Sequence, residues 1–284
     1  MPTYSKPTDT RQGFSIVLYG PPLVGKTSTL IDPNWKVCLI DLDQNSTPLQ
    51  DAENVTVVSC ETFEDYLSVK ADAERGYRIE GGKKVRMDFD LYVVDSFTKL
   101  EAYIKDWVVR SYAPNRRREI SSKFGAQSDW QDLQDQEIEE VRDWQTYTKR
   151  KDKPLNVLWI GHDMTVYDGM GAPTSMQIAL QGRYASLRIM AAVDAVFYMF
   201  KSTKKDFYAA LRKDTSKLEN PNEVVRGVYT VDQGIIKSEA RVSPTRRKEL
   251  KPFIFNIVWS EIYEMIGYKN AAPQPKMTLD DTDN

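Results

Sequence analysis

The stretch FSIVLYGPPLVGKTS, residues 14–28, decides the fold of this chain. Its first part is a mostly apolar run that ends at Gly20, which is typical of a buried strand that leads into a loop. The second part fits the pattern G-x-x-x-x-G-K-[ST], whose backbone N–H groups surround phosphate oxygens. We expect the phosphate-binding residues to be Gly20, Pro21, Pro22, Leu23, Val24, Gly25, Lys26, Thr27 and Ser28. The alternative is an ordinary glycine-containing turn.

The residue types in this loop suit a nucleoside triphosphate. Gly20 and Gly25 let the backbone approach an anion closely, because a Cβ would obstruct it. Lys26 places a positive charge between the β- and γ-phosphates, and the Thr27 hydroxyl can ligate Mg²⁺. A helix that begins near Gly25 adds its positive end, although Pro33 keeps this helix short. The loop therefore predicts ATP and Mg²⁺ as cofactors, with GTP left open as the nucleotide.

Four further apolar runs resemble the strand before the loop, at 36–41, 54–58, 91–95 and 155–160. Each is apolar at consecutive positions, which is typical of strands covered on both faces. Helical patterns lie between them, at 61–75, 97–112 and 129–150. Strands that alternate with helices predict an α/β fold, with a mostly parallel central sheet flanked by helices and built from right-handed crossovers.

The remaining segments complete the predicted domain organisation. A flexible lead-in covers residues 1–12, a single domain covers 13–268, and a disordered acidic tail covers 269–284. Two inserts interrupt the domain, a surface hairpin at 77–90 and a mobile loop at 111–130. Late in the chain, the sequence predicts antiparallel strands at 207–211, 225–231 and 235–240, and a helix at 252–267.

The composition bounds the class of protein. With 41% apolar and 28% charged side chains over 284 residues, the chain can form a substantial core and is neither collagen-like nor wholly disordered. No apolar run reaches membrane-spanning length, and residues 1–13 lack the apolar centre of a secretory signal. Cys38 and Cys60, both in apolar runs, fit a reducing cytoplasm. Since 39 basic residues are balanced by 41 acidic ones, any nucleic-acid contact needs a local basic patch.

Polar side chains follow three of the predicted strands. Asp95 ends the run LYVVD, where a carboxylate that helps to hold Mg²⁺ is expected; a helix cap is the alternative. Asp43 lies on the same side as Asp41 by alternation and is a candidate for orienting or deprotonating the attacking water, against a role in stabilising the loop. His162 lies at the sheet edge where ligands of open α/β sheets gather. It either senses the γ-phosphate or is structural.

In this order, the loop and the strand ends resemble the RecA-like ATPases, and most closely the phage-encoded nucleotide-binding ATPases linked to single-strand annealing and recombination. The resemblance covers residues 13–241 and implies a RecA-like P-loop NTPase fold. It implies that Asp43 activates water, that Asp95 serves Mg²⁺ and that His162 is the polar sensor of the γ-phosphate. The segment GRYASLR at 182–188 is similar to a motif of RecA itself.

The resemblance further implies DNA contact through residues 163–180, a loop that contains no Lys or Arg. Because affinity for a phosphate backbone normally depends on such cations, Tyr167 and the nearby methionines are candidates to stack on bases or pack against them. The alternative is a flexible loop that covers the nucleotide. A second candidate for DNA contact, or else a solvated charged loop, is the cluster of Arg116, Arg117, Arg118 and Lys123.

The same resemblance implies sites completed between subunits. Candidate cations for a neighbouring subunit are Arg212, Lys213 and Arg241, with a plain surface role as the alternative. We therefore expect an Mg²⁺-dependent ATPase that acts on single-stranded DNA in phage-type recombination or replication. It would form a ring or filament in the cytoplasm of a bacterial host, without a membrane partner.

Two other functions remain open at this point. One is a nucleotide-dependent loader with weak turnover, which recruits a replication or recombination protein through the helix at 129–150 or the acidic tail. The other is a P-loop kinase, in which the arginines at 116–118 would form a lid over the phosphates.

Overall fold

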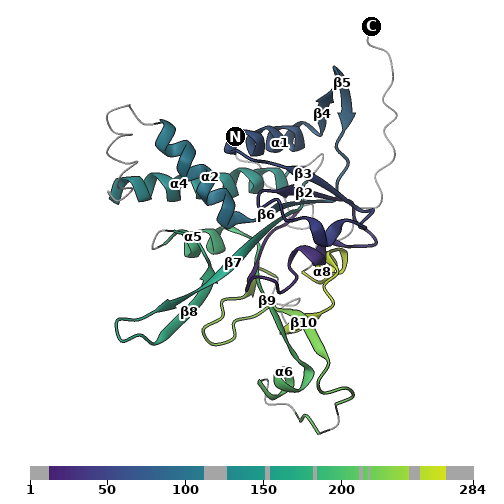
Figure 1. Cartoon of the computed structure of the whole chain (residues 1–284), viewed down its shortest axis with the longest axis vertical. Helices are drawn as coiled ribbons and strands as arrows, with labels where there is room; N and C mark the ends of the chain where they lie inside the picture. The colour runs from purple at the N-terminus through teal and green to yellow at the C-terminus, as the bar shows by residue number, and fades with distance from the viewer. Residues whose placement is uncertain are drawn as a thin grey trace, which may run out of the picture.

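A mostly parallel sheet runs through the middle of the molecule and carries helices on its faces, which confirms the predicted fold class (Figure 1). The computed structural model describes residues 13–111, 127–150, 154–181, 184–210, 214–216, 218–242 and 250–266. In spatial order, the strands of the main sheet are β12 (Phe253–Phe255), β10 (Val224–Tyr229), β9 (Ala195–Thr203), β1 (Ser15–Gly20), β7 (Val157–Tyr167), β6 (Leu91–Asp95), β2 (Val37–Asp41) and β3 (Val55–Ser59). In addition, β8 (Pro173–Ile178) pairs with β7, and β11 (Glu239–Ala240) pairs with β9.

β1 lies in the interior of the sheet, between β7 and β9, and is parallel to both. Its side chains alternate between two cores, with Val17 and Tyr19 on one face and Ile16 and Leu18 on the other. The first face packs under α1 (Phe63–Arg75), α2 (Phe97–Ser111), α4 (Gln127–Thr148) and α5 (Ala185–Ala192). The second is closed by the short helices η2 (Thr27–Leu30) and η3 (Thr47–Leu49) and by α8 (Trp259–Met265). The loop after β1 therefore starts from a strand that is fixed on both faces.

The predicted strands before residue 160 all appear, with small shifts at their ends. β6 matches the predicted bounds, β2 begins one residue later than predicted, and β1 and β3 are shifted by one residue at both ends. β7 begins near the expected position but continues to Tyr167. The prediction that β3 is covered on both faces was wrong, since Thr56 and Val57 are exposed. The reason is its position, because β3 is the edge strand of the sheet.

The three predicted helices and the predicted hairpin are also present. They appear as α1, α2, α4 and the pair β4 (Tyr77–Glu80) and β5 (Lys83–Arg86). α1 starts with a capping box, in which the Asp65 N–H donates to the Thr62 hydroxyl at 3.1 Å. It ends at Gly76, whose left-handed φ of 76° is cheap only for glycine.

Late segments were predicted less well. Residues 207–211 were predicted as a strand, but α6 (Lys204–Ala210) is a helix that starts where Thr203 and Asp206 exchange hydrogen bonds. Residues 252–267 were predicted as one helix, but they form β12 and then α8. The aromatic rings of β12 pack against Phe207, which favours the strand there. Of the strand predicted at 235–240, only the two residues of β11 form.

Several predicted segments lie outside the described residues. These are the lead-in at 1–12, most of the insert at 111–130, and the acidic tail at 269–284. The division into one domain with two flanking tails therefore stays a prediction. In the parts of the chain that the structure does describe, no helix has both the length and the apolar character needed to cross a membrane.

Two carboxyl groups are buried where α2 packs on α4. Glu137 is fully buried, and Glu101 is 2% exposed and accepts a hydrogen bond from the Gln181 N–H. Burial, and then the nearby charge of Glu101, raises the pKa of Glu137 far above its ordinary value. A group whose pKa is raised by folding stabilises the folded state only at low pH, and this contribution is lost as the pH rises from the unfolded pKa to the folded one.

Glu137→Gln should therefore stabilise the protein at pH 7 by about 1–3 kcal/mol, because the amide needs no proton to be neutral. Urea unfolding at several pH values measures this effect. The gain should be small at pH 4 and should grow towards pH 8. Glu139→Gln, at an exposed position of the same helix, is the matched control. Equal stabilities of the two variants at pH 8 would contradict the prediction.

Candidate functional site

The carboxyl ends of β1, β6 and β2, and the middle of β7 at His162, lie along one edge of the sheet, where the phosphate loop leaves β1. The parallel register places Gly20 beside His162 and Asp41 beside Asp95. Ligands of open α/β sheets bind at this edge, because the loops that follow the strands can surround them. The fold therefore brings together the strand ends that the sequence singled out.

The phosphate loop curls around the side chain of Lys26. This side chain is buried, and its ammonium donates to the carbonyl oxygens of Gly20 and Pro21, both at 2.8 Å. Gly20 cannot carry a side chain, since a Cβ there would lie 2.5 Å from the carbonyl oxygen of Met199. Gly25 has a φ of 99°, which L side chains rarely adopt. The loop therefore needs its glycines for its own packing and backbone conformation, whereas close approach to an anion stays a prediction.

The helix after the loop is shorter than a helix-dipole role requires. η2 is a single 3₁₀ turn over Thr27–Leu30, and the chain leaves it at Ile31 and Asp32, ahead of Pro33. A four-residue turn offers few free N–H groups and a small dipole. An anion at this edge would therefore depend mainly on the loop amides and Lys26, and less on the end of η2 than the sequence predicted.

Thr27 and Asp95 face each other across the site. The Thr27 hydroxyl donates to Oδ2 of Asp95 at 2.7 Å. Burial raises the pKa of Asp95 to about 6, and the charges of Asp43 and Asp41 act in the same direction. The Thr27 hydrogen bond and the charge of Lys26 oppose this rise. A cation placed between these oxygens would relieve the repulsion among the carboxylates.

Asp43 and Asp41 differ in exposure, although alternation predicted the same side for both. β2 ends at Asp41, which is buried, and the chain then turns so that Asp43 is exposed. The Asp43 N–H donates to the carbonyl oxygen of Asp95 at 3.4 Å. Its carboxylate influences the pKa of Lys26, Asp95 and His162. Asp43 is therefore an accessible carboxylate at the centre of the site.

His162 is half-buried and lies on β7 beside Gly20, where the phosphate loop begins. Burial lowers its pKa and the charge of Lys26 lowers it further, while the charges of Asp43 and Asp163 oppose this change, so the neutral ring is favoured at pH 7. Within the described part of the chain, its Nδ1 is buried and has no hydrogen-bond partner. An unpaired ring nitrogen beside Lys26 can take a hydrogen bond once a ligand arrives.

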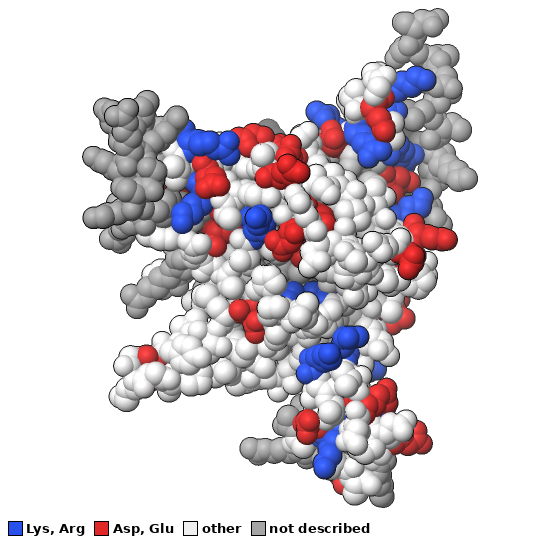
Figure 2. All heavy atoms as spheres, in the orientation of Figure 1, with Lys and Arg blue, Asp and Glu red and all other residues white. Residues whose placement is uncertain are grey.

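The predicted DNA loop is not a loop but the end of a long hairpin. β7 continues past His162 and pairs with β8 from Asp163 opposite Ile178 out to Tyr167. The alternating pattern of this segment explains the strand pairing. The hairpin projects from the body of the molecule, and its surface in Figure 2 shows no Lys or Arg. Tyr167 is 61% exposed and Met170, at the tip, is 96% exposed.

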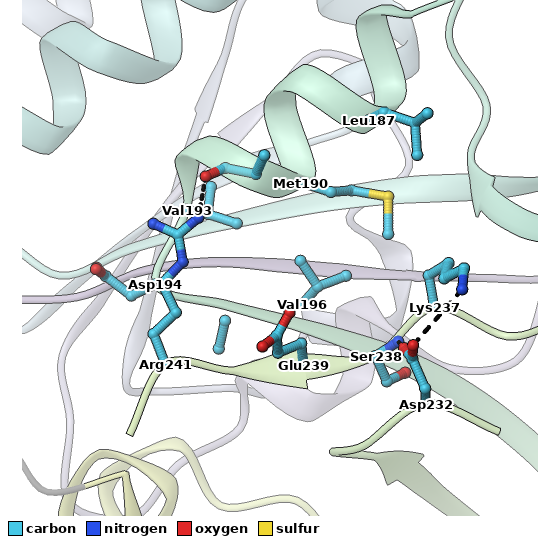
Figure 3. A pocket seen from close by; sticks show the side chains of 12 residues that line it. Leu187, Met190, Val193, Asp194, Val196, Asp232, Lys237, Ser238, Glu239 and Arg241 are labelled. Carbon is cyan, nitrogen blue, oxygen red and sulfur yellow. Dashed lines mark hydrogen bonds and ion pairs between the residues drawn. The ribbon is translucent and has the colours of Figure 1, made fainter. Parts of the chain in front are cut away.

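Arg241 lies at the amino ends of the parallel strands, on the opposite side of the sheet from the phosphate loop. β11 pairs with Ala195 and Val196, the first residues of β9. The Arg241 guanidinium donates to the carbonyl oxygen of Ala191, beside a cavity of about 240 Å³ (Figure 3). It therefore does not reach the site of its own chain, and a role in a neighbouring subunit stays a prediction. The other predicted cations lie outside the described residues; they are Arg116, Arg117, Arg118, Lys123, Arg212 and Lys213.

Two further residues near the loop were not predicted. Asp163 accepts a hydrogen bond from the Tyr198 hydroxyl at 3.1 Å, and its charge acts on the pKa of Lys26. Its position directly after His162 was the signal that could have identified it. Arg226 lies over Gly25, and only the pairing of β10 with β9 brings it there. No local pattern in the sequence indicates that pairing.

The oxygen atoms of Thr27 and Asp95 fit a magnesium ion. Mg²⁺ prefers hard oxygen ligands, and in nucleotide sites one or two protein oxygens suffice because phosphates supply others. Among the described residues, no three His, Cys, Asp or Glu side chains gather into a metal site. The donor set therefore suits Mg²⁺ held together with a phosphate ligand rather than by the protein alone.

A comparison with known families gives one match. A family model described as an AAA domain matches residues 12–231, or most of the chain. This span includes the phosphate loop and the strand ends that carry Asp43, Asp95 and His162. No curated protein matches the chain.

Proposed function

Since the chain belongs to the AAA domain family of P-loop NTPases, we propose that it binds ATP with Mg²⁺ at residues 20–28 and hydrolyses it. The observation that carries this proposal is the meeting of Lys26, Asp43, Asp95 and His162 at one sheet edge. Lys26 would hold the β- and γ-phosphates, and the exposed Asp43 would orient or deprotonate the attacking water. The neutral His162 ring would contact the γ-phosphate.

Thr27 and Asp95 would hold the magnesium ion in this proposal. When bound, the ion neutralises charge on the β- and γ-phosphates. Thr27→Val keeps the branched shape but removes the hydroxyl that now donates to Asp95 at 2.7 Å. The Mg²⁺ concentration for half-maximal turnover should rise by about tenfold in this variant. Titration of turnover with MgCl₂ measures it, and Thr27→Ser, which retains the hydroxyl, should stay within about twofold of the wild type. An unchanged Mg²⁺ requirement in Thr27→Val would contradict the assignment.

We further propose that the hairpin of β7 and β8 acts on single-stranded DNA, in a phage-type recombination or replication role, as part of an oligomer. Two observations support this. β7 leads directly from His162 into this hairpin, which we call the arm, so the nucleotide site and the arm share one strand. Tyr167 and Met170 are exposed towards its tip, where they can stack on bases without any phosphate contact.

Turnover with and without an unstructured oligonucleotide tests the DNA role. We expect DNA to stimulate phosphate release in the wild type several-fold, by about 3–10 times, and Tyr167→Ala to abolish this stimulation. Ile79→Ala is the control, because Ile79 is 58% exposed on the separate hairpin of β4 and β5. If the wild type binds no DNA at low salt in any nucleotide state, the DNA role is lost and the ATPase remains.

A second function, a nucleotide-dependent loader, is favoured by the lack of cations on the arm. Residues 162–178 contain no Lys or Arg, whereas exposed Tyr and Met side chains are common in protein interfaces. In that case the arm would contact a replication or recombination protein, or a second copy of this chain. ATP-dependent capture of one defined protein, together with turnover that DNA does not change, would favour the loader over the DNA-dependent ATPase.

A further inference from the structure

A cavity of about 440 Å³ opens beside the phosphate loop. Its wall combines Gly25, Ser28 and Thr29 with residues of β9, of β10 and of the turn after β12. We call this cavity the β10 pocket. Its volume lies in the range of pockets that hold small organic ligands, about 300–1,000 Å³. Nothing in the roles given above to Lys26, Asp43, Asp95 or His162 uses it.

The β10 pocket lies on the other side of β1 from the proposed metal site. Asp95 and His162 come from β6 and β7, on one side of β1, whereas β9, β10 and β12 follow in that order on the other side. β9 and β10 continue past the end of β1, towards α6 (Figure 1). The two strands therefore provide a wall beyond the sheet edge, next to the loop.

Thr27 and Ser28, which are consecutive in the loop, face the two sides of β1. Thr27 turns towards Asp95, with 2.7 Å between the hydroxyl and the carboxylate. Ser28 is exposed and lines the β10 pocket. A triphosphate with its γ end beside Lys26 and Asp95 would therefore have its α end near Ser28, and the group attached to the α-phosphate would enter the pocket.

The chemistry of the pocket wall suits a base and a sugar. Met199, Val225 and Phe255 supply apolar surface for the flat face of a nucleobase. The ion pair of Lys204 and Glu223 adds charged groups to the same wall that can contact the hydroxyls of a sugar. Asn256 lies exposed at the end of β12 with a φ of 51°, a left-handed conformation that Asn adopts more readily than most residues. Its amide offers both a donor and an acceptor to the edge of a base.

Arg226 lies at the junction of the pocket and the phosphate loop. A Cβ added to Gly25 would be 3.4 Å from the Cδ of Arg226, so the stem of this side chain covers the loop. The register of β10 on β9, with Arg226 opposite Lys201, fixes this position. Arg226 forms no ion pair with another described residue, which leaves the guanidinium available to an anion.

We propose that the β10 pocket receives the nucleoside of the bound triphosphate, with Arg226 beside the α-phosphate. The proposal rests on the proposed function, because the phosphates must first bind at residues 20–28. It gives the loop a direction: the γ-phosphate lies on the side of β6 and β7, and the base lies on the side of β10. Specificity for the base then comes from Asn256 and the apolar wall rather than from the phosphate loop.

A comparison of ATP with inorganic tripolyphosphate, which lacks the nucleoside, tests the pocket. Val224→Trp places a large ring at a 56% exposed position of the pocket wall, where the strand can accept it. By calorimetry with Mg²⁺, we expect this variant to bind ATP at least about tenfold more weakly and to bind tripolyphosphate within about twofold of the wild type. Val85→Trp, at a 37% exposed strand position of the distant hairpin, should change neither affinity.

Other outcomes of the comparison overturn the pocket. An ATP affinity that Val224→Trp leaves unchanged removes the nucleoside from the pocket, while the phosphate site stands. A parallel loss of ATP and tripolyphosphate shows that the ring disturbs the loop and not a nucleoside. If the wild type binds neither ligand, the proposed function itself is wrong and the pocket proposal falls with it.

Photolabelling of the wild type gives a second measurement that does not depend on a variant. After irradiation with 8-azido-ATP and Mg²⁺, we expect the label on peptides that contain Met199, residues 224–226 or residues 255–257. Excess unlabelled ATP should suppress it. Label that is confined to other peptides overturns the proposal, and label on these peptides that tripolyphosphate also suppresses ties the pocket to the phosphate loop.

Discussion

Lys26→Met should reduce ATP turnover by at least about a thousandfold and should weaken ATP binding so far that calorimetry detects no heat at micromolar concentrations. Methionine keeps the length and the apolar stem of lysine but removes the ammonium. In the structure this ammonium is buried and lies 2.8 Å from two carbonyl oxygens of the loop. Burial lowers the pKa of Lys26, and the charges of Asp95, Asp163 and Asp43 oppose that change, so an anion that arrives beside it finds a poorly hydrated cation.

Phosphate release and calorimetry measure the two effects separately. Since Met leaves the carbonyl groups of Gly20 and Pro21 without their present donor, a thermal melt should accompany both assays. Lys83→Met, at an exposed position of β5, is the matched control and should behave as the wild type. A folded Lys26→Met protein that keeps a tenth of the wild-type turnover would falsify the assignment of the phosphate site.

Asp43→Asn should lower turnover by about two to three orders of magnitude but change ATP affinity by no more than about threefold. The substitution keeps the shape of the side chain and removes its ability to accept a proton from water. Asp43 is exposed at the site and influences the pKa of Lys26, Asp95 and His162, so its carboxylate would lie near a phosphate bound by Lys26 without being needed to hold it.

Single-turnover phosphate release isolates the chemical step for this variant, and calorimetry gives the affinity. Asp51→Asn, at an exposed position after η3, controls for the loss of one negative charge and should leave both quantities unchanged. An Asp43→Asn variant that loses affinity and turnover in equal proportion would show that Asp43 supports binding and not the activation of water.

The sequence predicted correctly those strands whose apolar pattern matches a buried position in the sheet. The run before Gly20, and the run that ends at Asp95, are continuous apolar segments, and both strands lie in the interior of the sheet. Because the two strands end at the same edge, the sequence also indicated which polar residues would meet. The structure brings Lys26, Asp43, Asp95 and His162 together there, while their roles remain proposals.

The late part of the chain was harder to predict, because contacts between distant residues decide its structure. Phe207 lies in α6, and its ring stacks on the ring of Phe200 with 4.7 Å between their centroids. Phe253 and Phe255 belong to a strand whose rings pack against Phe207. Short apolar segments of this kind fit a helix or a strand equally well by pattern. For the same reason the sequence did not indicate Arg226, whose position depends on the register of β10 on β9.

The continuous path of β7 has a mechanical consequence. β7 pairs with β8 from Asp163 onwards, and the five residue steps from His162 to Tyr167 span about 16 Å at roughly 3.3 Å each. A small tilt of the paired strands at the histidine would therefore be amplified into a larger displacement of Tyr167. Nucleotide binding at the sheet edge would then change the angle of the β7–β8 hairpin, and no segment would need to melt or become ordered.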